Sequence, residues 1–200
     1  FDIAEEADDY YFPPLTGSYL KIARYLIVLT SVFITPLFLL MKQNPEIVPR
    51  ALQFIIQDNQ YNVPIFWQFI ILEIAIDGLR LAALNTPSSL SGTMGIIGAI
   101  ALSEFTIDVG WFSTEAILYM AFVTIAAFSQ PNYELAYCLK FIRIILLIFT
   151  VLFNLWGFIA GLALTAILLL TNKTVSGKSY LYPLIPFNGK AFLNKVLRLR

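Results

Sequence analysis

Hydrophobic residues occur along this chain in long runs that short polar stretches separate. The longest run covers residues 138–170, where Lys140 and Arg143 are the only charged side chains. A water-soluble fold does not readily bury such a helix on all sides, whereas about 20 apolar residues are enough to cross a bilayer. The run therefore predicts a long membrane helix whose basic first turns reach into the membrane interface.

The same pattern predicts further helices. They cover residues 24–41, 64–84, 89–108 and 113–128, with a short amphipathic helix at the interface over 51–56. Pro36 interrupts the first of them, and a hydroxyl such as Thr35 can satisfy the backbone carbonyl that the proline frees. Gly110 provides the turn before the helix over 113–128. The predicted fold class is an all-α integral membrane protein, a transmembrane bundle with four to five long hydrophobic helices.

Basic residues near the membrane set the expected topology. Lys21 and Arg24 lie at the start of the first span, and six basic residues without an acid follow the last one, so both ends are expected inside. Five crossings would separate the two ends, whereas four bring them together. The helix over 64–84 carries the most charges, so it is expected to be interfacial or re-entrant on the outer side.

Charge also divides the chain into three parts. Residues 1–21 form an acidic juxtamembrane arm, residues 22–172 the transmembrane helical bundle, and residues 173–200 a basic cytoplasmic tail. The chain begins at Phe1 and shows no signal peptide. The arm is therefore expected to be the end of a soluble N-terminal domain that precedes it in a longer protein.

Composition agrees with a membrane protein and excludes several chemistries. Hydrophobic residues make up 58% of the chain and charged residues 13%, against about 25% charged in soluble domains. There is no histidine and only one cysteine, which excludes intrachain disulfides, histidine-based catalysis and imidazole metal sites. No glycine-rich phosphate loop is present. We expect no enzyme activity, no catalytic residue, no cofactor, no metal and no nucleic-acid partner.

Three charged residues share one face of the helix predicted over 64–84. Glu73, Asp77 and Arg80 stand four and three positions apart, so the arginine can pair with Asp77 while the two carboxylates stay close together. Ionisable groups at membrane depth normally face protein or a water-filled cavity, and they often mark ion paths. The cluster is thus either a structural salt bridge or part of a conduction path.

The helix predicted over 89–108 is rich in small residues. Gly92 and Gly95 begin a series of small side chains at steps of three and four, which is typical of tight helix packing in membranes. Glu104 and Asp108 close this helix four positions apart. In a symmetric oligomer they would form rings of negative charge, which suit cation passage, although exposure at the interface explains them equally well.

Small and polar residues also form a stripe along the predicted final helix. Its members, at steps of four, three, four and four, are Thr150, Asn154, Gly157, Gly161 and Thr165. Gly157 and Gly161 make a GxxxG pair, so helix association is the first interpretation and pore lining the second. Asn154 is the residue of this stripe expected to hydrogen-bond across helices.

Five short motifs follow one another in a fixed order along the chain. They are Glu73-Ile74 with Asp77 and Arg80; Thr86-Pro87 with Thr93-Met94-Gly95; Ile107-Asp108-Val109-Gly110; Pro131-Asn132-Tyr133-Glu134-Leu135; and Ser179 to Asn188. In these motifs the chain resembles the C-terminal membrane region of the germinant-receptor A-subunit family (GerA family) of spore-forming bacteria. The ending Pro186-Phe187-Asn188-Gly189-Lys190-Ala191 with its short basic tail favours a branch of sporulation proteins over the nutrient-receptor subunits.

The resemblance implies a protein of the spore inner membrane that acts in germination. It also implies symmetric homo-oligomers, with a pentamer as the expected state, that pass ions together with other germination membrane proteins. The resemblance brings no catalytic residues. An ion channel or channel-like subunit is the first hypothesis, and a non-conducting scaffold or signal-coupling subunit is the second. A secondary transporter is less favoured, because the sequence shows no internal repeat.

Neutralising the acidic ring gives a first test. If the ring selects cations, Glu104→Gln or Asp108→Asn should reduce the cation preference of the oligomer, while protein level and oligomer size stay normal. Ion selectivity of the reconstituted protein measures this. Unchanged selectivity in both variants would remove these two residues from the mechanism.

Overall fold

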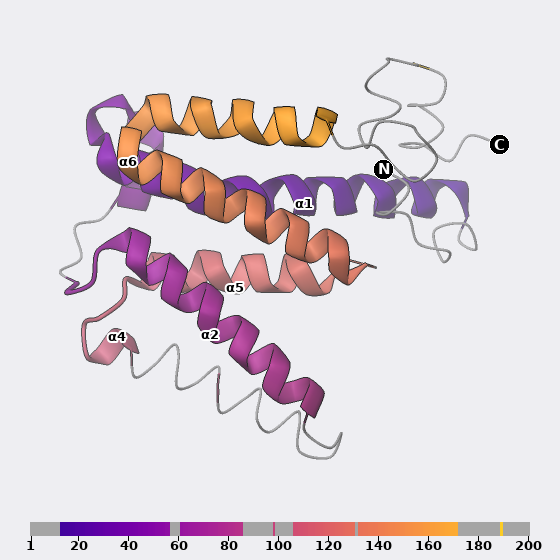
Figure 1. Cartoon of the computed structure of the whole chain (residues 1–200), viewed down its shortest axis with the longest axis horizontal. Helices are drawn as coiled ribbons and strands as arrows, with labels where there is room; N and C mark the ends of the chain where they lie inside the picture. The colour runs from indigo at the N-terminus through magenta and orange to yellow at the C-terminus, as the bar shows by residue number, and fades with distance from the viewer. Residues whose placement is uncertain are drawn as a thin grey trace. The chain divides into compact units, whose positions relative to one another are not determined.

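The computed structural model describes residues 13–56, 61–85, 98, 106–130, 132–171 and 189 of the 200-residue chain. All regular secondary structure within these residues is helical (Figure 1). The elements are α1 (Pro14–Gln43), the 3-10 helices η3 (Pro45–Ile47) and η4 (Arg50–Ile56), then α2 (Ile65–Asn85), α4 (Thr106–Asp108), α5 (Thr114–Phe128) and α6 (Tyr133–Thr171).

Two of these helices are long and apolar enough to cross a membrane. They are α1, with 30 residues and a mean hydropathy of 1.9, and α6, with 39 residues and a mean hydropathy of 2.3. The predicted helices over 64–84 and 113–128 are present as α2 and α5, but α2 carries three charged residues and α5 has only 15 residues. The described part of the chain therefore contains fewer clear spans than the four to five predicted.

The chain divides into two compact units. The terminal unit consists of residues 1–36 and 125–200, and the central unit of residues 37–124. Helix α1 passes from the terminal to the central unit after Pro36, the proline inside this helix.

In the terminal unit, α1 begins ten residues before the predicted span. Pro14 is its first residue, where the missing N–H costs nothing, and the Gly17 N–H donates to the Pro13 carbonyl at 3.0 Å. Residues 14–21, assigned from sequence to the acidic arm, are thus helical. Large apolar side chains at Leu15, Tyr19, Leu26 and Leu29 are exposed, whereas Lys21 is buried. The helix therefore turns its apolar side outward.

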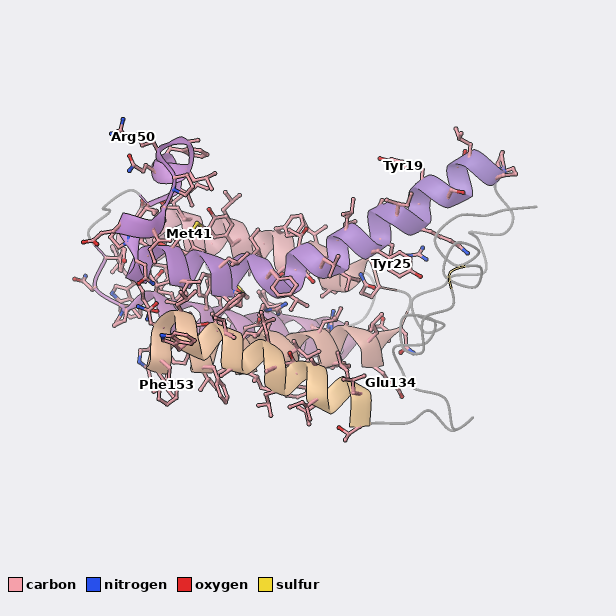
Figure 2. All side chains as sticks on the ribbon, turned by 90° about the horizontal axis from the view of Figure 1, so that it is seen from above. Tyr19, Tyr25, Met41, Arg50, Glu134 and Phe153 are labelled. Carbon is pink, nitrogen blue, oxygen red and sulfur yellow. The ribbon has the colours of Figure 1, made fainter. Side chains whose placement is uncertain are left out.

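Helix α6 differs from the single long helix that its sequence predicts. Asn154 has φ 56° and ψ −132°, which is not helical, and the chain reverses there so that α6 is a hairpin (Figure 1). Asparagine is among the few residues that tolerate positive φ, because its short polar side chain can bond locally. We call residues 133–153 the first limb and residues 155–171 the second limb. Figure 2 shows Phe153 and Glu134 at opposite ends of the first limb.

The two limbs pack closely against each other through the GxxxG pair. A Cβ atom on Gly157 would overlap the carbonyl oxygen of Phe149, and one on Gly161 would lie 3.1 Å from Cδ2 and 3.6 Å from Cα of Leu146. In a continuous helix Leu146 and Gly161 would be about 22 Å apart. The stripe predicted on one helix is thus divided between two antiparallel limbs, and its glycines pack within the chain.

In the central unit, polar caps and an aromatic cluster organise the helices. The Asn44 side-chain amide donates to the Leu40 carbonyl at 3.0 Å and closes the end of α1. The Phe38 ring packs edge-on against the rings of Phe69 and Tyr119, with centroid distances of 6.1 and 4.8 Å. Gly110 has φ 70° and makes the predicted turn before α5. The end of α1 therefore meets α2 and α5 in one core.

Adding a methyl group at two glycines should have opposite effects. Gly157→Ala places a Cβ against the backbone of Phe149 and should destabilise the protein by about 1–3 kcal/mol, the usual cost of overpacking. Gly78→Ala is the matched control, because nothing lies within 4 Å of its Cβ position and alanine favours a helix by about 1 kcal/mol. Heating the detergent-solubilised protein and measuring the loss of its size-exclusion peak compares the two. Equal stability of both variants would contradict the close limb contact.

Candidate functional site

The predicted charged cluster lies on α2, where the structure buries its first member. Glu73 is only 4% exposed and lies on the same side of the helix as the buried Phe69 and Leu72. Asp77 and Arg80, one and two turns further on, are half-buried. The α2 helix thus presents an acidic group to the interior of the central unit and carries further charge toward its C-terminal end.

A buried polar network fixes the helix that carries Glu73. The Gln68 amide donates through Nε2 to the Val63 carbonyl at 2.6 Å, and its Oε1 accepts the Ser113 N–H at 2.9 Å. Ser113 is the N-cap of α5, since its Oγ accepts the Ala116 N–H at 3.2 Å. One side chain therefore joins the start of α2 to the start of α5.

Backbone hydrogen bonds reinforce the same junction. The Asn62 N–H donates to the Gly110 carbonyl at 2.9 Å, and the Val63 N–H donates to the Trp111 carbonyl at 3.4 Å. The turn at Gly110 brings these carbonyls into position. These hydrogen bonds join the segment before α2 to the turn before α5, and they fix where α2 begins. The position of Glu73 follows from this starting point.

The remaining predicted acidic and small residues are only partly described. Gly92, Gly95 and Glu104 lie outside the described residues. Asp108 is the last residue of α4 and is exposed. Gly98 packs against Leu79 of α2, where an added Cβ would overlap the Leu79 side chain. Gly98, which belongs to the predicted helix over 89–108, thus lies directly against the helix that carries the charged cluster.

Arg143, one of the two basic residues predicted to reach the membrane interface, is buried against α1. It is 4% exposed, and its Nη1 donates to the Ser31 carbonyl in α1 at 3.2 Å. Thr35 also behaves differently from the prediction, because among the described residues its buried Oγ1 has no hydrogen-bond partner. Arg143 thus bonds a backbone carbonyl five residues before Pro36, next to the Val32 carbonyl that the proline frees.

A signal for Arg143 was present in the sequence. Arg143, Leu147 and Thr150 follow at steps of four and three, which places all three on one helical face, and all three are buried. The stripe of small and polar residues thus extends back to this arginine. Lys21 on α1 has a similar pattern, because it shares a helical face with Ser31 and Thr35, and all three are buried.

The described residues contain no group of three His, Cys, Asp or Glu side chains that could hold a metal ion. They do contain charged side chains that are buried inside the two units. In the terminal unit the buried charged residues are cations, Lys21 and Arg143, and in the central unit Glu73 is a buried anion. Such groups interact strongly with ions, because the surrounding dielectric is low.

The burial pattern defines the class of protein. Polar residues such as Ser31, Thr35, Gln68 and Thr150 are buried, while large apolar side chains are exposed along α1, α2, α5 and α6. Exposed apolar helix faces together with buried polar groups are typical of a protein that packs against lipid. The chain is an all-helical protein, in its described parts, with helices of membrane-spanning length and polar groups turned inward.

Comparison with known proteins supplies the family. The family model for the Bacillus/Clostridium GerA spore germination protein matches residues 1–200. The chain therefore belongs to the GerA family of spore germination proteins. This confirms the resemblance that the five sequence motifs indicate.

Individual relatives agree with this assignment. The chain is 34% identical over 198 residues to Stage V sporulation protein AF of Bacillus subtilis (strain 168), covering 99% of this chain and 40% of that protein. It is 24% identical to Spore germination protein A1 of the same organism, covering 98% of the chain and 41% of the relative. It is 25% identical to Spore germination protein GerQA of Bacillus cereus, covering 99% and 40%. None of these names denotes an enzyme.

The chain spans about two fifths of the length of these relatives. The higher identity to Stage V sporulation protein AF agrees with the sporulation branch that the C-terminal motif favours. No solved structure gives a significant match to the chain.

Removing the buried amide of Gln68 should loosen the start of α2. In Gln68→Leu the Ser113 N–H loses its acceptor and the Val63 carbonyl loses a donor, which should cost about 1–3 kcal/mol of stability. Gln43→Leu, at an exposed position on α1, is the control and should leave stability nearly unchanged. Thermal unfolding of the detergent-solubilised protein measures both. If the two variants unfold at the same temperature, the network does not hold α2.

Proposed function

We propose that this chain is the membrane region of an oligomeric ion channel, or channel-like subunit, that contributes to ion release during spore germination. The protein would lie in the spore inner membrane as a symmetric homo-oligomer, with a pentamer as the expected state, beside other germination membrane proteins. Membership of a spore germination family supports the biological setting. The two helices of membrane-spanning length support the location.

The observation that carries the proposal is the buried carboxyl group of Glu73. Glu73 is the ninth of the 21 residues of α2, which places it about 12 Å along the helix from its start. Ionisable side chains so far inside an apolar helix are expensive, and they face either protein or a water-filled path. A carboxylate in this place would attract cations and repel anions.

The charges next to Glu73 favour the passage of a cation over its tight binding. Asp77 adds a second carboxylate one turn away, and Arg80 adds a positive charge on the same face. A conducting site must bind an ion strongly enough for entry but weakly enough for release. The arginine offsets part of the attraction of the two acids, so the cluster would hold a cation only briefly.

A second candidate function is a non-conducting scaffold or signal-coupling subunit. The observation that favours it is Gln68, a fully buried polar residue on the same helix that is bonded only to backbone groups of its own unit. Glu73 would then have the same task, to hold α2 in its place. Under this alternative, loss of the charge would disturb assembly without changing which ions pass.

Charge removal at Glu73 separates the two functions. In vesicles with the reconstituted full-length protein, Glu73→Gln should lower the cation preference roughly tenfold, which corresponds to about 1.4 kcal/mol of lost attraction. Glu46→Gln is the matched control, because Glu46 is an exposed acid in η3 and its loss should leave selectivity as in the unmodified protein. Reversal potentials under a salt gradient measure the preference.

Two results would count against a conduction path at Glu73. Equal selectivity of the Glu73→Gln and Glu46→Gln proteins would exclude it from the path. A reduced amount of oligomer, with unchanged selectivity in what remains, would favour the scaffold. In spores, deletion of the gene should slow potassium release after nutrient addition, and unchanged release would argue against an ion-releasing role.

A further inference from the structure

The hairpin of α6 has dimensions that fit a bilayer. Asn154 divides the 39 residues of α6 into 21 before it and 17 after it. At about 1.5 Å per residue the limbs are roughly 31 and 25 Å long, and the hydrocarbon core of a bilayer is about 30 Å thick. The first limb matches this thickness, and the 17 residues of the second are at the lower end of the lengths that span a bilayer.

Charge is distributed along the hairpin as two crossings require. Residues 144–153 and the whole second limb carry no charged side chain, while Glu134 and Lys140 lie near the open end. Arg143 is the charged residue nearest to the middle of the first limb, and it is buried with its Nη1 on the Ser31 carbonyl. A backbone carbonyl is a partner that arginine commonly uses at membrane depth.

The two limbs form one body. Gly157 and Gly161 allow contact with the backbone of the first limb at Phe149 and Leu146, and small residues of this kind hold helices together in lipid. Thr150 and Thr165, the polar residues at the two ends of the stripe, are buried and bond backbone carbonyls of their own limbs. The hairpin therefore buries its polar stripe and can insert as a unit.

The tip of the hairpin carries exposed aromatic residues. Phe153 is 63% exposed and Trp156 is 78% exposed, on either side of the polar Asn154. Tryptophan concentrates at membrane interfaces, where its apolar ring and its N–H both find a suitable environment. At the open end the residues before α6, Ser129, Gln130 and Asn132, are polar. Both ends of the hairpin thus have the composition of an interface.

We propose that α6 crosses the membrane twice, with residues 152–156 as an anchor in the lipid interface of the far side, so that Thr171 returns to the side where α6 begins. This inference rests on the membrane location in the proposed function and not on ion conduction. Its partner is the headgroup region of the bilayer.

The second crossing changes the expected topology. If every helix predicted from the sequence crosses the membrane, counting α6 as two spans turns the predicted five crossings into six, and the chain ends meet on one side. Basic residues near both ends then lie inside, as the positive-inside rule expects. The helix α2 no longer has to leave the bilayer, so Glu73 can lie within the membrane.

Cysteine labelling tests the hairpin directly. Cys138 is the only cysteine, so a Cys138→Ser protein provides a background without thiols. Single cysteines at Ser129 and Thr171, both exposed, report the two ends of α6, and cysteines at Asn154 and Phe153 report the tip. The full-length proteins are treated with a membrane-impermeant maleimide in right-side-out and in inverted vesicles, with and without detergent.

The proposal expects Ser129→Cys and Thr171→Cys to react from the same side, and at least one tip cysteine to react from the opposite side. End cysteines that react from opposite sides would overturn the hairpin. Tip cysteines that react from the same side as the ends, or only in detergent, would overturn the far-side anchor. Carbonate extraction of the same vesicles keeps the two proposals apart, because release of the protein would overturn membrane location itself and the hairpin with it.

Discussion

The close contact between the two limbs of α6 determines how the terminal unit is built. Gly157 lies so near the Phe149 carbonyl that no side chain fits between them, and this approach is possible only because the chain reverses at Asn154. Without the reversal, residues 146 and 161 would lie about 22 Å apart. The contact also leaves Arg143 and Thr150 on a common buried face, with Arg143 bonded to α1. One tight backbone contact thus sets the shape of the hairpin, and a buried arginine ties it to the first helix.

In the central unit the helices are held together by different contacts. There a single amide, that of Gln68, bonds to two backbone groups near the starts of α2 and α5, and an aromatic cluster of Phe38, Phe69 and Tyr119 fills the space beside it. In both units several buried polar side chains, among them Gln68, Arg143 and Thr150, are bonded to backbone, which is what an apolar environment requires of them. Glu73 is a buried carboxylate in the central unit, and a carboxylate is more costly to bury than an amide. Its burial gives the clearest physical reason to look for ion chemistry on α2.

Family membership and structure contribute different parts of the functional argument. The family relates the chain to spore germination, and its relatives are named for sporulation and germination rather than for a reaction. The structure contributes a set of buried charges, Lys21 and Arg143 in one unit and Glu73 in the other, inside helices with apolar outer faces. The chain spans about two fifths of the length of these relatives.

The sequence alone determined the helical class, the family, the placement of α2 and α5, the turn at Gly110 and the common face of Glu73, Asp77 and Arg80. These follow from local periodicity, from glycine conformation and from ordered motifs, all of which can be read within one segment. The tertiary structure decided the reversal at Asn154, the burial of Arg143 and the network of Gln68. The apolar run over 138–170 is equally compatible with one helix or two, because the hydrophobicity of the residues does not show whether the chain continues or reverses. The choice depends on contacts between residues far apart in sequence, such as Gly161 with Leu146, and these exist only once the limbs have packed.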